Sequence, residues 1–347
     1  MSIGLELQNT LYVTTGGTYV HLDNNTVRID IERETRLRIP IHHLGGIVCF
    51  GDVMLSPALI ARCAEDGVGV CLLDRNGRFR ARIEGPLSGN VLLRRAQFRT
   101  QEDTDSSLAL ARQFVLAKLR NTRHVLLRGV RDCKSESDRE QLGAAAKHLD
   151  ASLRSAGNVA SHDALRGVEG EAARTYFGVF DRLVRPDLRT HFAPAGRSRR
   201  PPRDPCNALL SFLYTLLVND CRSALETVGL DPQVGFLHAL RPGRPALALD
   251  LAEEFRALLA DRAALTLVNR GQIGPEDFRT TEGGAVLLDE GTRRTVATHW
   301  QERKQRSAAH PLLETDVPHG LLPTVQAHLL ARALRGDTEG YLPYAAR

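Results

Sequence analysis

Three segments of the sequence carry acidic, histidine and hydroxyl side chains in spacings that suit catalysis. The first is GVEGEAARTYF (167–177), where Glu169, Ala173 and Tyr176 follow a helical i, i+4, i+7 spacing. Gly167 and Gly170 cost a helix about 1 kcal/mol each, and a close backbone approach beside Glu169 would account for that cost. The alternative for Glu169 is an ordinary solvated carboxylate.

The second segment is DPCNALLSFLYTLLVNDC (204–221), which predicts a buried helix because it is almost wholly apolar. Asp204 is a natural N-cap and the proline after it suits the first helical position. Asn207, Ser211 and Tyr214 follow the same i, i+4, i+7 spacing and form one polar stripe. That stripe either makes hydrogen bonds between helices or lines a polar site, and both interpretations remain open.

The third segment (235–263) contains Asp250, Glu253 and Glu254 at i, i+3 and i+4, so at least two carboxylates share a helical face. Asp250 is predicted to open this helix and has an ordinary role as its first-turn residue. His238 precedes the cluster by twelve positions. Carboxylates with one imidazole make a hard, oxygen-rich site that suits Mg²⁺ or Mn²⁺ better than structural zinc. Spacing alone does not bring Glu169 to His238.

The elements that must position these residues fall into two classes, which predicts an α+β fold. Residues 1–90 consist of short runs rich in β-branched residues, separated by turns, with one helix between Ser56-Pro57 and Gly67. Residues 91–347 read as an essentially all-α domain with helices at about 91–101, 105–130, 137–157, 161–184, 204–228, 250–269, 286–306 and 321–335. The loop 185–205, rich in arginine and proline, is either a solvated linker or a phosphate-contacting loop.

The composition limits the classes of protein to which this chain can belong. The 347 residues are 42% hydrophobic and 25% charged, which is typical of a globular protein with a buried core. The net charge is +5 and the pI is about 9, which favours a polyanionic partner. The six cysteines include no C-x-x-C pair, and we expect those near residues 49–71 to be buried thiols. Without a signal peptide or a membrane-spanning run, a cytoplasmic location is expected.

The motifs, taken in order, resemble the CRISPR-associated integrase family. They are GxEGxxAxxYF, DPxNALLSFxY and GFLH…LALDLxEEFR, with VCFGDVMLSP (48–57) and GPLSGNVLLRRAQFR (85–99) before them and WQERKQR (300–306), HPLL (310–313) and LLPTVQAHLLARALRGDTEGYLPY (321–344) after them. The resemblance covers nearly the whole chain. The DLxEEFR form and the N-terminal segment look most like the type I-C branch.

The resemblance implies a β-rich N-terminal domain that dimerises and a helical catalytic domain. It implies a catalytic metal site of Glu169, His238 and Glu253 that binds Mg²⁺ or Mn²⁺, with Asp250 as an adjacent acidic position. Asn207 and Tyr214 match polar positions that face this site, and Ser211 and Tyr176 are supporting candidates. Glu171 and Glu254 are expected to be surface residues.

The implied reaction is metal-dependent attack of a DNA 3′-hydroxyl on a phosphodiester at a CRISPR repeat boundary. Double-stranded and branched DNA would be held by its backbone, in a sequence-tolerant and salt-sensitive way. The partners implied are a second copy of the chain and a small ferredoxin-like adaptation protein. The arginines expected to contact DNA are Arg174, Arg197, Arg199, Arg200, Arg203, Arg241, Arg244 and Arg256.

Two other functions remain open at the level of sequence. A nuclease that acts alone on branched DNA in repair or recombination needs the same metal site, and only a dependence on the small partner distinguishes it. A non-catalytic DNA-binding scaffold makes the acidic residues ordinary caps and surface charges. Bound metal would argue against the scaffold.

Overall fold

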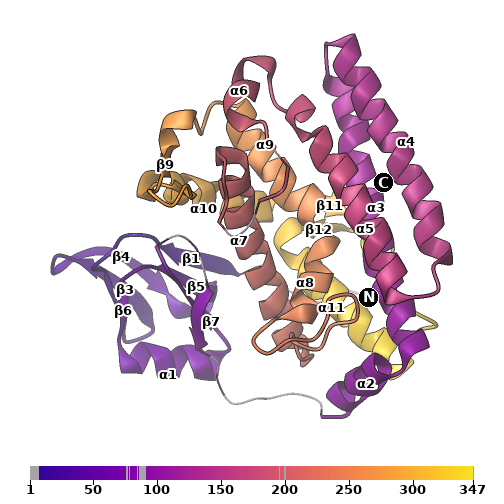
Figure 1. The fold of residues 1–347 in the computed structure, drawn as a ribbon. Helices are drawn as coiled ribbons and strands as arrows, with labels where there is room; N and C mark the ends of the chain where they lie inside the picture. Colours follow the sequence, from indigo (N-terminus) through magenta and orange to yellow (C-terminus); the bar gives the residue numbers. More distant parts are fainter. Residues whose placement is uncertain are drawn as a thin grey trace. The chain divides into compact units, whose positions relative to one another are not determined.

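The computed structural model describes residues 8–346, apart from 76, 78, 84, 86–90, 195, 199 and 200. Two of the arginines expected to contact DNA, Arg199 and Arg200, therefore lie outside the described residues. The chain divides into two compact units (Figure 1). The first comprises residues 1–88 and 288–306, and the second comprises residues 89–287 and 307–347.

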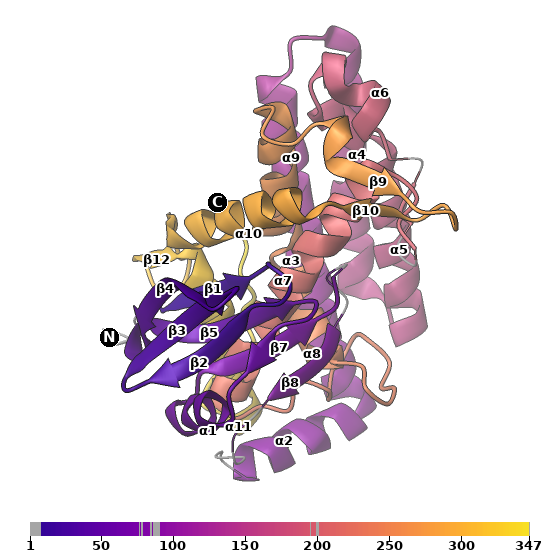
Figure 2. The same ribbon diagram turned by 90° about the vertical axis from the view of Figure 1, so that its left-hand side faces the viewer.

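The first unit contains two four-stranded sheets. One has the order β1-β5-β7-β8, in which β1 and β7 run parallel to β5 and β8 runs antiparallel to β7. The other has the order β4-β3-β2-β6. Figure 2 shows the strands of this unit. Their bounds are β1 Asn9–Val13, β2 Tyr19–Asp23, β3 Thr26–Ile31, β4 Glu34–Pro40, β5 Leu44–Phe50, β6 Met54–Leu55, β7 Gly69–Leu73 and β8 Phe79–Ile83.

Helix α1 (Pro57–Asp66) begins and ends where the sequence predicts. The Ser56 side chain accepts a hydrogen bond from the Leu59 amide, and Gly67 ends the helix in the left-handed conformation with φ 72°. The alternating apolar residues of the strands and the inner face of α1 form the core of the unit. Cys49, Cys63 and Cys71 are buried, as predicted.

Helix α10 (Glu290–Gln305) belongs to the first unit, although the sequence analysis placed it in the helical domain. Its polar side chains bond to the first strand: Lys304 donates to the Thr10 hydroxyl over 3.1 Å, and Gln301 donates to the Asn9 side chain over 3.1 Å. The helical spacing of this segment says nothing about which unit it joins, because that choice depends on contacts almost 300 residues apart.

The second unit is helical and contains the candidate site. Its helices are α2 Val91–Glu102, α3 Thr104–Asp132, α4 Glu136–Asn158, α5 His162–Gly178, α6 Arg189–Phe192, α7 Pro205–Val228, α8 Ala246–Glu253, α9 Arg262–Asn269 and α11 Leu322–Arg335. A π-helical turn, η4 (Arg256–Asp261), lies between α8 and α9. No helix in the described part of the chain is long and apolar enough to cross a membrane.

Several helix predictions are corrected by the structure. The helix predicted at 161–184 ends at Gly178, and a 3-10 turn (Phe180–Leu183) follows it. The helix predicted at 286–306 begins at Glu290, after a strand. Residues 91–347 are also not all α, since they contain the short strands β9 Phe278–Thr280, β10 Val286–Leu288, β11 Ser307–Ala309 and β12 Asp316–Pro318. Three-residue strands carry too little alternation for sequence periodicity to reveal them.

Candidate functional site

Asp250 holds the segment that carries His238. Its Oδ2 accepts hydrogen bonds from the Phe236 and Leu237 amides at 2.6 and 3.0 Å, and its Oδ1 accepts from the His238 amide at 3.0 Å. The same Oδ1 lies 2.6 Å from His238 Nδ1. An ionised carboxylate accepts only, so Nδ1 carries the proton and the Nε2 lone pair is left available as a ligand.

The prediction that Asp250 opens its helix is wrong. Helix α8 begins at Ala246, so Asp250 lies in its second turn, with 0% of its surface exposed. The hydrogen bonds of Asp250 reach outward to the preceding loop rather than to the start of its own helix. In this arrangement Asp250 is a positioning group for His238.

Gly235 allows the His238 segment to approach α8 closely. A Cβ added at Gly235 would lie 2.6 Å from the Ala246 carbonyl carbon and 2.7 Å from Asp250 Oδ2. We therefore expect Gly235→Ala to push this segment off the helix and lower the free energy of unfolding by about 1–3 kcal/mol, measured by urea denaturation. Gly170→Ala is the control, because its Cβ meets nothing within 4 Å and the helix gains about 1 kcal/mol. Equal stability of the Gly235 variant and wild type would contradict the expectation.

Glu253 lies one turn beyond Asp250, beside His238. Its Oε1 is 3.8 Å from His238 Nε2 and 2.8 Å from an Arg256 guanidinium nitrogen, and only 3% of its side chain is exposed. Burial by itself would raise the pKa of this carboxyl. The charges of Arg256 and Lys118 outweigh burial and hold the pKa well below its ordinary value, so Glu253 is an anion.

Lys118 of α3 joins Glu253 to Glu169. Its ammonium lies 2.7 Å from Glu253 Oε2 and also donates a hydrogen bond to Glu169 Oε1. Glu169 of α5 and Glu253 of α8 thus meet at Lys118 of α3, and His238, in the loop before α8, lies beside Glu253. Neither Lys118 nor its spacing was singled out from the sequence, because its partners are 51 and 135 residues away.

The donor set at this point fits a hard divalent cation. Two carboxylates and one imidazole with a free Nε2 are the ligands that Mg²⁺ or Mn²⁺ takes in proteins. As the side chains stand, no three His, Cys, Asp or Glu residues in the described ranges are close enough together to hold a metal ion. The ammonium of Lys118 lies between the two carboxylates.

The expectation of a close backbone approach beside Glu169 is wrong. A Cβ at Gly167 or Gly170 would meet nothing within 4 Å. The two glycines place no side chains on the surface next to Glu169, and the Glu169 side chain is 25% exposed. Neighbouring Glu171 is 60% exposed and contacts His148, as expected for a surface residue.

The polar stripe of α7 organises the arginine-rich loop. Asp204 caps the helix as predicted, accepting from the Asn207 amide at 2.7 Å. The Asn207 side chain accepts from the Ser198 amide at 3.2 Å and from the Arg197 guanidinium, and donates to the Gly196 carbonyl at 2.8 Å. Ser211 Oγ lies 3.4 Å from Arg197. Asn207 and Ser211 therefore bond the arginine-rich loop rather than a neighbouring helix, and they hold Arg197 against α7.

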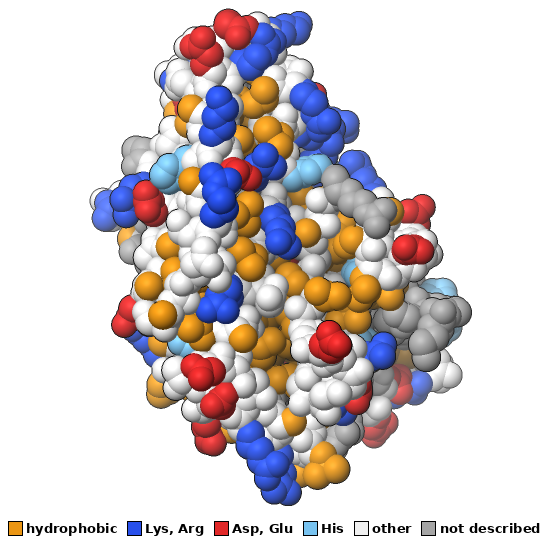
Figure 3. Space-filling view, turned by 90° about the vertical axis from the view of Figure 1, so that its right-hand side faces the viewer, with side chains coloured by type: hydrophobic (Ala, Val, Ile, Leu, Met, Phe, Trp, Pro, Cys, Tyr) orange, Lys and Arg blue, Asp and Glu red, His pale blue; other side chains and the backbone are white. Residues whose placement is uncertain are grey.

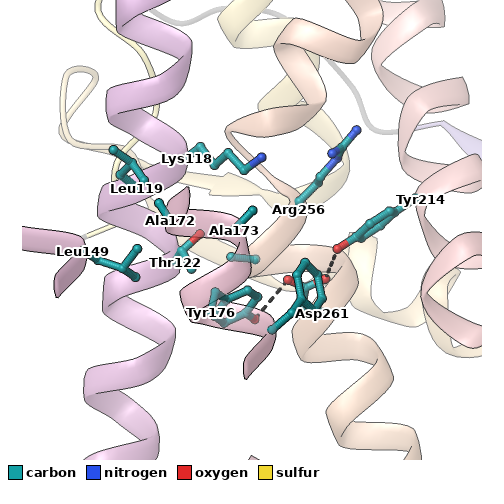
Figure 4. A pocket seen from close by; sticks show the side chains of 12 residues that line it. Lys118, Leu119, Thr122, Leu149, Ala172, Ala173, Tyr176, Tyr214, Arg256 and Asp261 are labelled. Atoms are coloured by element: carbon teal, nitrogen blue, oxygen red, sulfur yellow. Dashed lines mark hydrogen bonds between the residues drawn. The ribbon is translucent and has the colours of Figure 1, made fainter. Parts of the chain in front are cut away.

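Tyr214 and Tyr176 converge on a buried carboxyl, that of Asp261 (Figure 4). Tyr214 donates to Asp261 at 2.6 Å and Tyr176 donates at 3.0 Å. Burial raises the pKa of Asp261 to about 6, although these hydrogen bonds and two nearby arginines lower it. The three residues line a cavity of about 30 Å³ together with Lys118 and Arg256.

Asp261 was not predicted from the sequence. It lies in the π-helical turn η4, which interrupts the 3.6-residue spacing of the α-helix. The signal that identifies it is a carboxylate in the run ALLADRAAL (257–265), where Arg262 is the one other polar residue.

The predicted DNA-contacting arginines fall into two groups. Arg197 and Arg256 each lie 5.0 Å from the Tyr214 ring centroid and are held against the site. Arg174, Arg203 and Arg241 are exposed, and Arg244 is half-buried. Figure 3 shows further Lys and Arg side chains on one face of the molecule. Exposed arginines of α3 and α4 pair with carboxylates one turn away, as Arg128 does with Asp132 and Arg154 with Asp150.

Glu254 is buried, which contradicts the expectation that it is a surface residue. It has 0% exposure, and its carboxyl accepts hydrogen bonds from the Tyr344 amide at 2.7 Å, the Gln326 side chain at 3.2 Å and the Tyr341 hydroxyl. Burial raises its pKa to about 8, against these hydrogen bonds. Glu254 thus anchors the C-terminal segment 341–346 and lies apart from the candidate site.

Known proteins are similar to this chain over most of its length. Residues 11–302 match the family described as CRISPR associated protein Cas1. The CRISPR-associated endonuclease Cas1 1 of Moorella thermoacetica is 54% identical over 98% of this chain and 99% of that protein. The CRISPR-associated endonuclease Cas1 2 of Rhodospirillum rubrum is 51% identical over 98% of each chain.

A solved structure shows the same fold. The Cas1 protein TM1797 of Thermotoga maritima superposes with a TM-score of 0.82 over 96% of this chain and 98% of that one, at 23% identity. The α+β fold predicted from the sequence is confirmed. With the family match over most of its length and relatives above 50% identity, this chain belongs to the CRISPR-associated Cas1 family.

Proposed function

We propose that the protein is a metal-dependent DNA integrase that joins the 3′-hydroxyl of a short DNA fragment to the boundary of a CRISPR repeat. The observation that carries this proposal is the convergence of Glu169, Glu253 and His238, with Asp250 fixing the imidazole tautomer. The names of the relatives, which are CRISPR-associated endonucleases, support a reaction at a DNA phosphodiester.

Glu169, Glu253 and His238 Nε2 would hold the metal ion, Mg²⁺ or Mn²⁺. When bound, the ion supplies Lewis-acid activation of the attacking oxygen and stabilises negative charge on the phosphate. His238 acts as a ligand rather than a general base. Asp250 accepts a hydrogen bond from Nδ1, so that the neutral imidazole has its lone pair on Nε2.

The reaction is a transesterification, in which one phosphodiester bond replaces another. The 3′-oxygen of the fragment bonds to phosphorus, the bond to the leaving 3′-oxygen breaks, and the proton of the attacking hydroxyl is balanced by protonation of the leaving oxygen. No external energy source is needed. Arg256 and Arg197, stacked on Tyr214, are placed to neutralise the phosphate. With water as the nucleophile, the same groups give an endonuclease.

DNA contacts in this proposal are mainly to the backbone, through Arg174, Arg203, Arg241 and Arg244. We propose a homodimer that acts in the cytoplasm with the small ferredoxin-like adaptation protein, as the family resemblance implies. The type I-C assignment rests on the DLxEEFR motif and is part of the same proposal.

A strand-transfer assay on labelled branched DNA tests the proposal. Wild type is compared with His238→Ala, with Mn²⁺ or Mg²⁺ and with chelator. We expect metal-dependent strand joining that falls by at least about 100-fold in the variant. The control is His148→Ala, since His148 is a half-exposed residue that contacts surface Glu171.

Two results would contradict the proposal. DNA binding without strand joining, with either metal and with the small partner added, would favour the scaffold. Hydrolysis without joining, unchanged by the partner, would favour a stand-alone nuclease.

A further inference from the structure

Lys118 is the cation nearest to both carboxylates of the candidate metal site. Its ammonium lies between Glu169 Oε1 and Glu253 Oε2, and only 13% of its side chain is exposed. It reaches this position from α3, whereas the carboxylates come from α5 and α8. Buried Glu253 and partly exposed Glu169, which come from different helices, would repel each other without a cation between them. Lys118 therefore stabilises the helix packing of the metal-free protein.

The two carboxylates already have cationic partners without a metal ion. Glu169 and Glu253 supply two negative charges, and Lys118 and Arg256 supply two positive ones. The carboxylate of Asp250 is a further negative charge, 2.6 Å from His238 Nδ1. A divalent cation beside Glu169 and Glu253 would be repelled by both side-chain cations in a largely buried place, where Coulomb energies are large. Departure of one of these two cations would therefore favour metal binding.

Geometry selects Lys118 as the cation that leaves. A Mg²⁺ ion coordinates carboxylate oxygens at about 2.0–2.1 Å and cannot share the space between them with an ammonium. Arg256 contacts the other oxygen of Glu253, Oε1, and is stacked on Tyr214, so it lies outside that space. Lysine is a compact charge on a flexible four-carbon chain and moves more readily than a stacked guanidinium.

We propose that Lys118 is an internal counter-ion that occupies the metal position and must be displaced by the catalytic cation. The free energy needed to displace Lys118 therefore lowers the affinity of the site for the metal ion. The inference rests on the proposed metal dependence. Figure 4 shows Lys118 and Arg256 at the same end of a small cavity, and Lys118 is among the residues that line it. This cavity of about 30 Å³ gives the displaced ammonium adjacent space.

The test is Mn²⁺ binding to the full chain by titration calorimetry, without DNA, for wild type and Lys118→Met. Methionine keeps the length of the side chain and removes its charge. We expect Lys118→Met to bind Mn²⁺ about tenfold more tightly or better. In chelator the variant should melt at a lower temperature than wild type, and Mn²⁺ should raise its melting temperature by more than that of wild type.

Arg256→Met is the matched control, because it removes an equal charge 2.8 Å from Glu253 but outside the space between the carboxylates. A clearly larger gain in Mn²⁺ affinity for Lys118→Met supports displacement. Equal gains in the two variants would show a general charge effect and overturn the inference, as would weaker Mn²⁺ binding by Lys118→Met. If wild type, Lys118→Met and Arg256→Met all fail to bind Mn²⁺, the proposed metal dependence itself fails.

Discussion

Asp250→Asn is expected to lower strand-transfer activity by at least about 100-fold and to weaken Mn²⁺ binding by about 10–100-fold, while the protein stays folded. The side-chain amide nitrogen of asparagine, placed at the position of Oδ1, donates to His238 Nδ1 instead of accepting from it. The imidazole then carries its proton on Nε2, where a metal ligand needs a lone pair. In addition, the His238 backbone amide loses its acceptor, which in the wild type is Asp250 Oδ1 at 3.0 Å. Single-turnover assays and calorimetry measure the two effects.

Asp231→Asn is the control for this substitution. The Asp231 side chain accepts a hydrogen bond from the Gln233 amide at 2.8 Å, and the oxygen of asparagine can replace it. Far-ultraviolet circular dichroism establishes that both variants are folded. If folded Asp250→Asn retains wild-type Mn²⁺ affinity and activity, Asp250 does not set the tautomer of His238.

Glu254→Gln is expected to remove much of the pH dependence of stability between about pH 5 and pH 8. The pKa of Glu254 is about 8 in the folded protein, against an ordinary value of 4.5, because the carboxyl is buried. The folded state therefore binds more protons than the unfolded state in this range, so its stability is fully present below about pH 4.5 and falls as the pH rises toward 8. Glutamine stays neutral, so we expect the free energy of unfolding of the variant at pH 9 to be higher than that of wild type by a few kcal/mol.

Urea denaturation of both proteins at several pH values measures this difference. The useful quantity is the difference in unfolding free energy between wild type and variant, because other groups such as Asp261 contribute equally to both. Glu171→Gln is the control, since the Glu171 side chain is 60% exposed. A difference between wild type and Glu254→Gln that does not change between pH 5 and pH 9 would show that Glu254 is ionised in the folded protein throughout.

Local sequence determined the elements and the chemical type of the candidate site. Ser56, Gly67 and Asp204 mark helix ends through contacts within three or four residues, so their roles are readable from the sequence. The alternating and helical spacings likewise divide the strands from the helices, because each reflects burial of one face of one element. The residue types in the motifs around Glu169, His238 and Glu253 predicted a site for Mg²⁺ or Mn²⁺. The family resemblance then predicted which residues form that site.

Only the tertiary structure decided which charges meet. Glu253 and Glu254 are adjacent in the chain, yet one faces His238 and Lys118 while the other binds the C-terminal segment. Lys118 reaches Glu169 across 51 residues, and Asn121, one turn further along α3, bonds the Glu254 carbonyl across 133. Periodicity gives the direction of a side chain around its own helix, but the identity of its partner depends on how α3, α5 and α8 pack. The counter-ion between the carboxylates and the anchor beneath the C-terminal segment are properties of that packing.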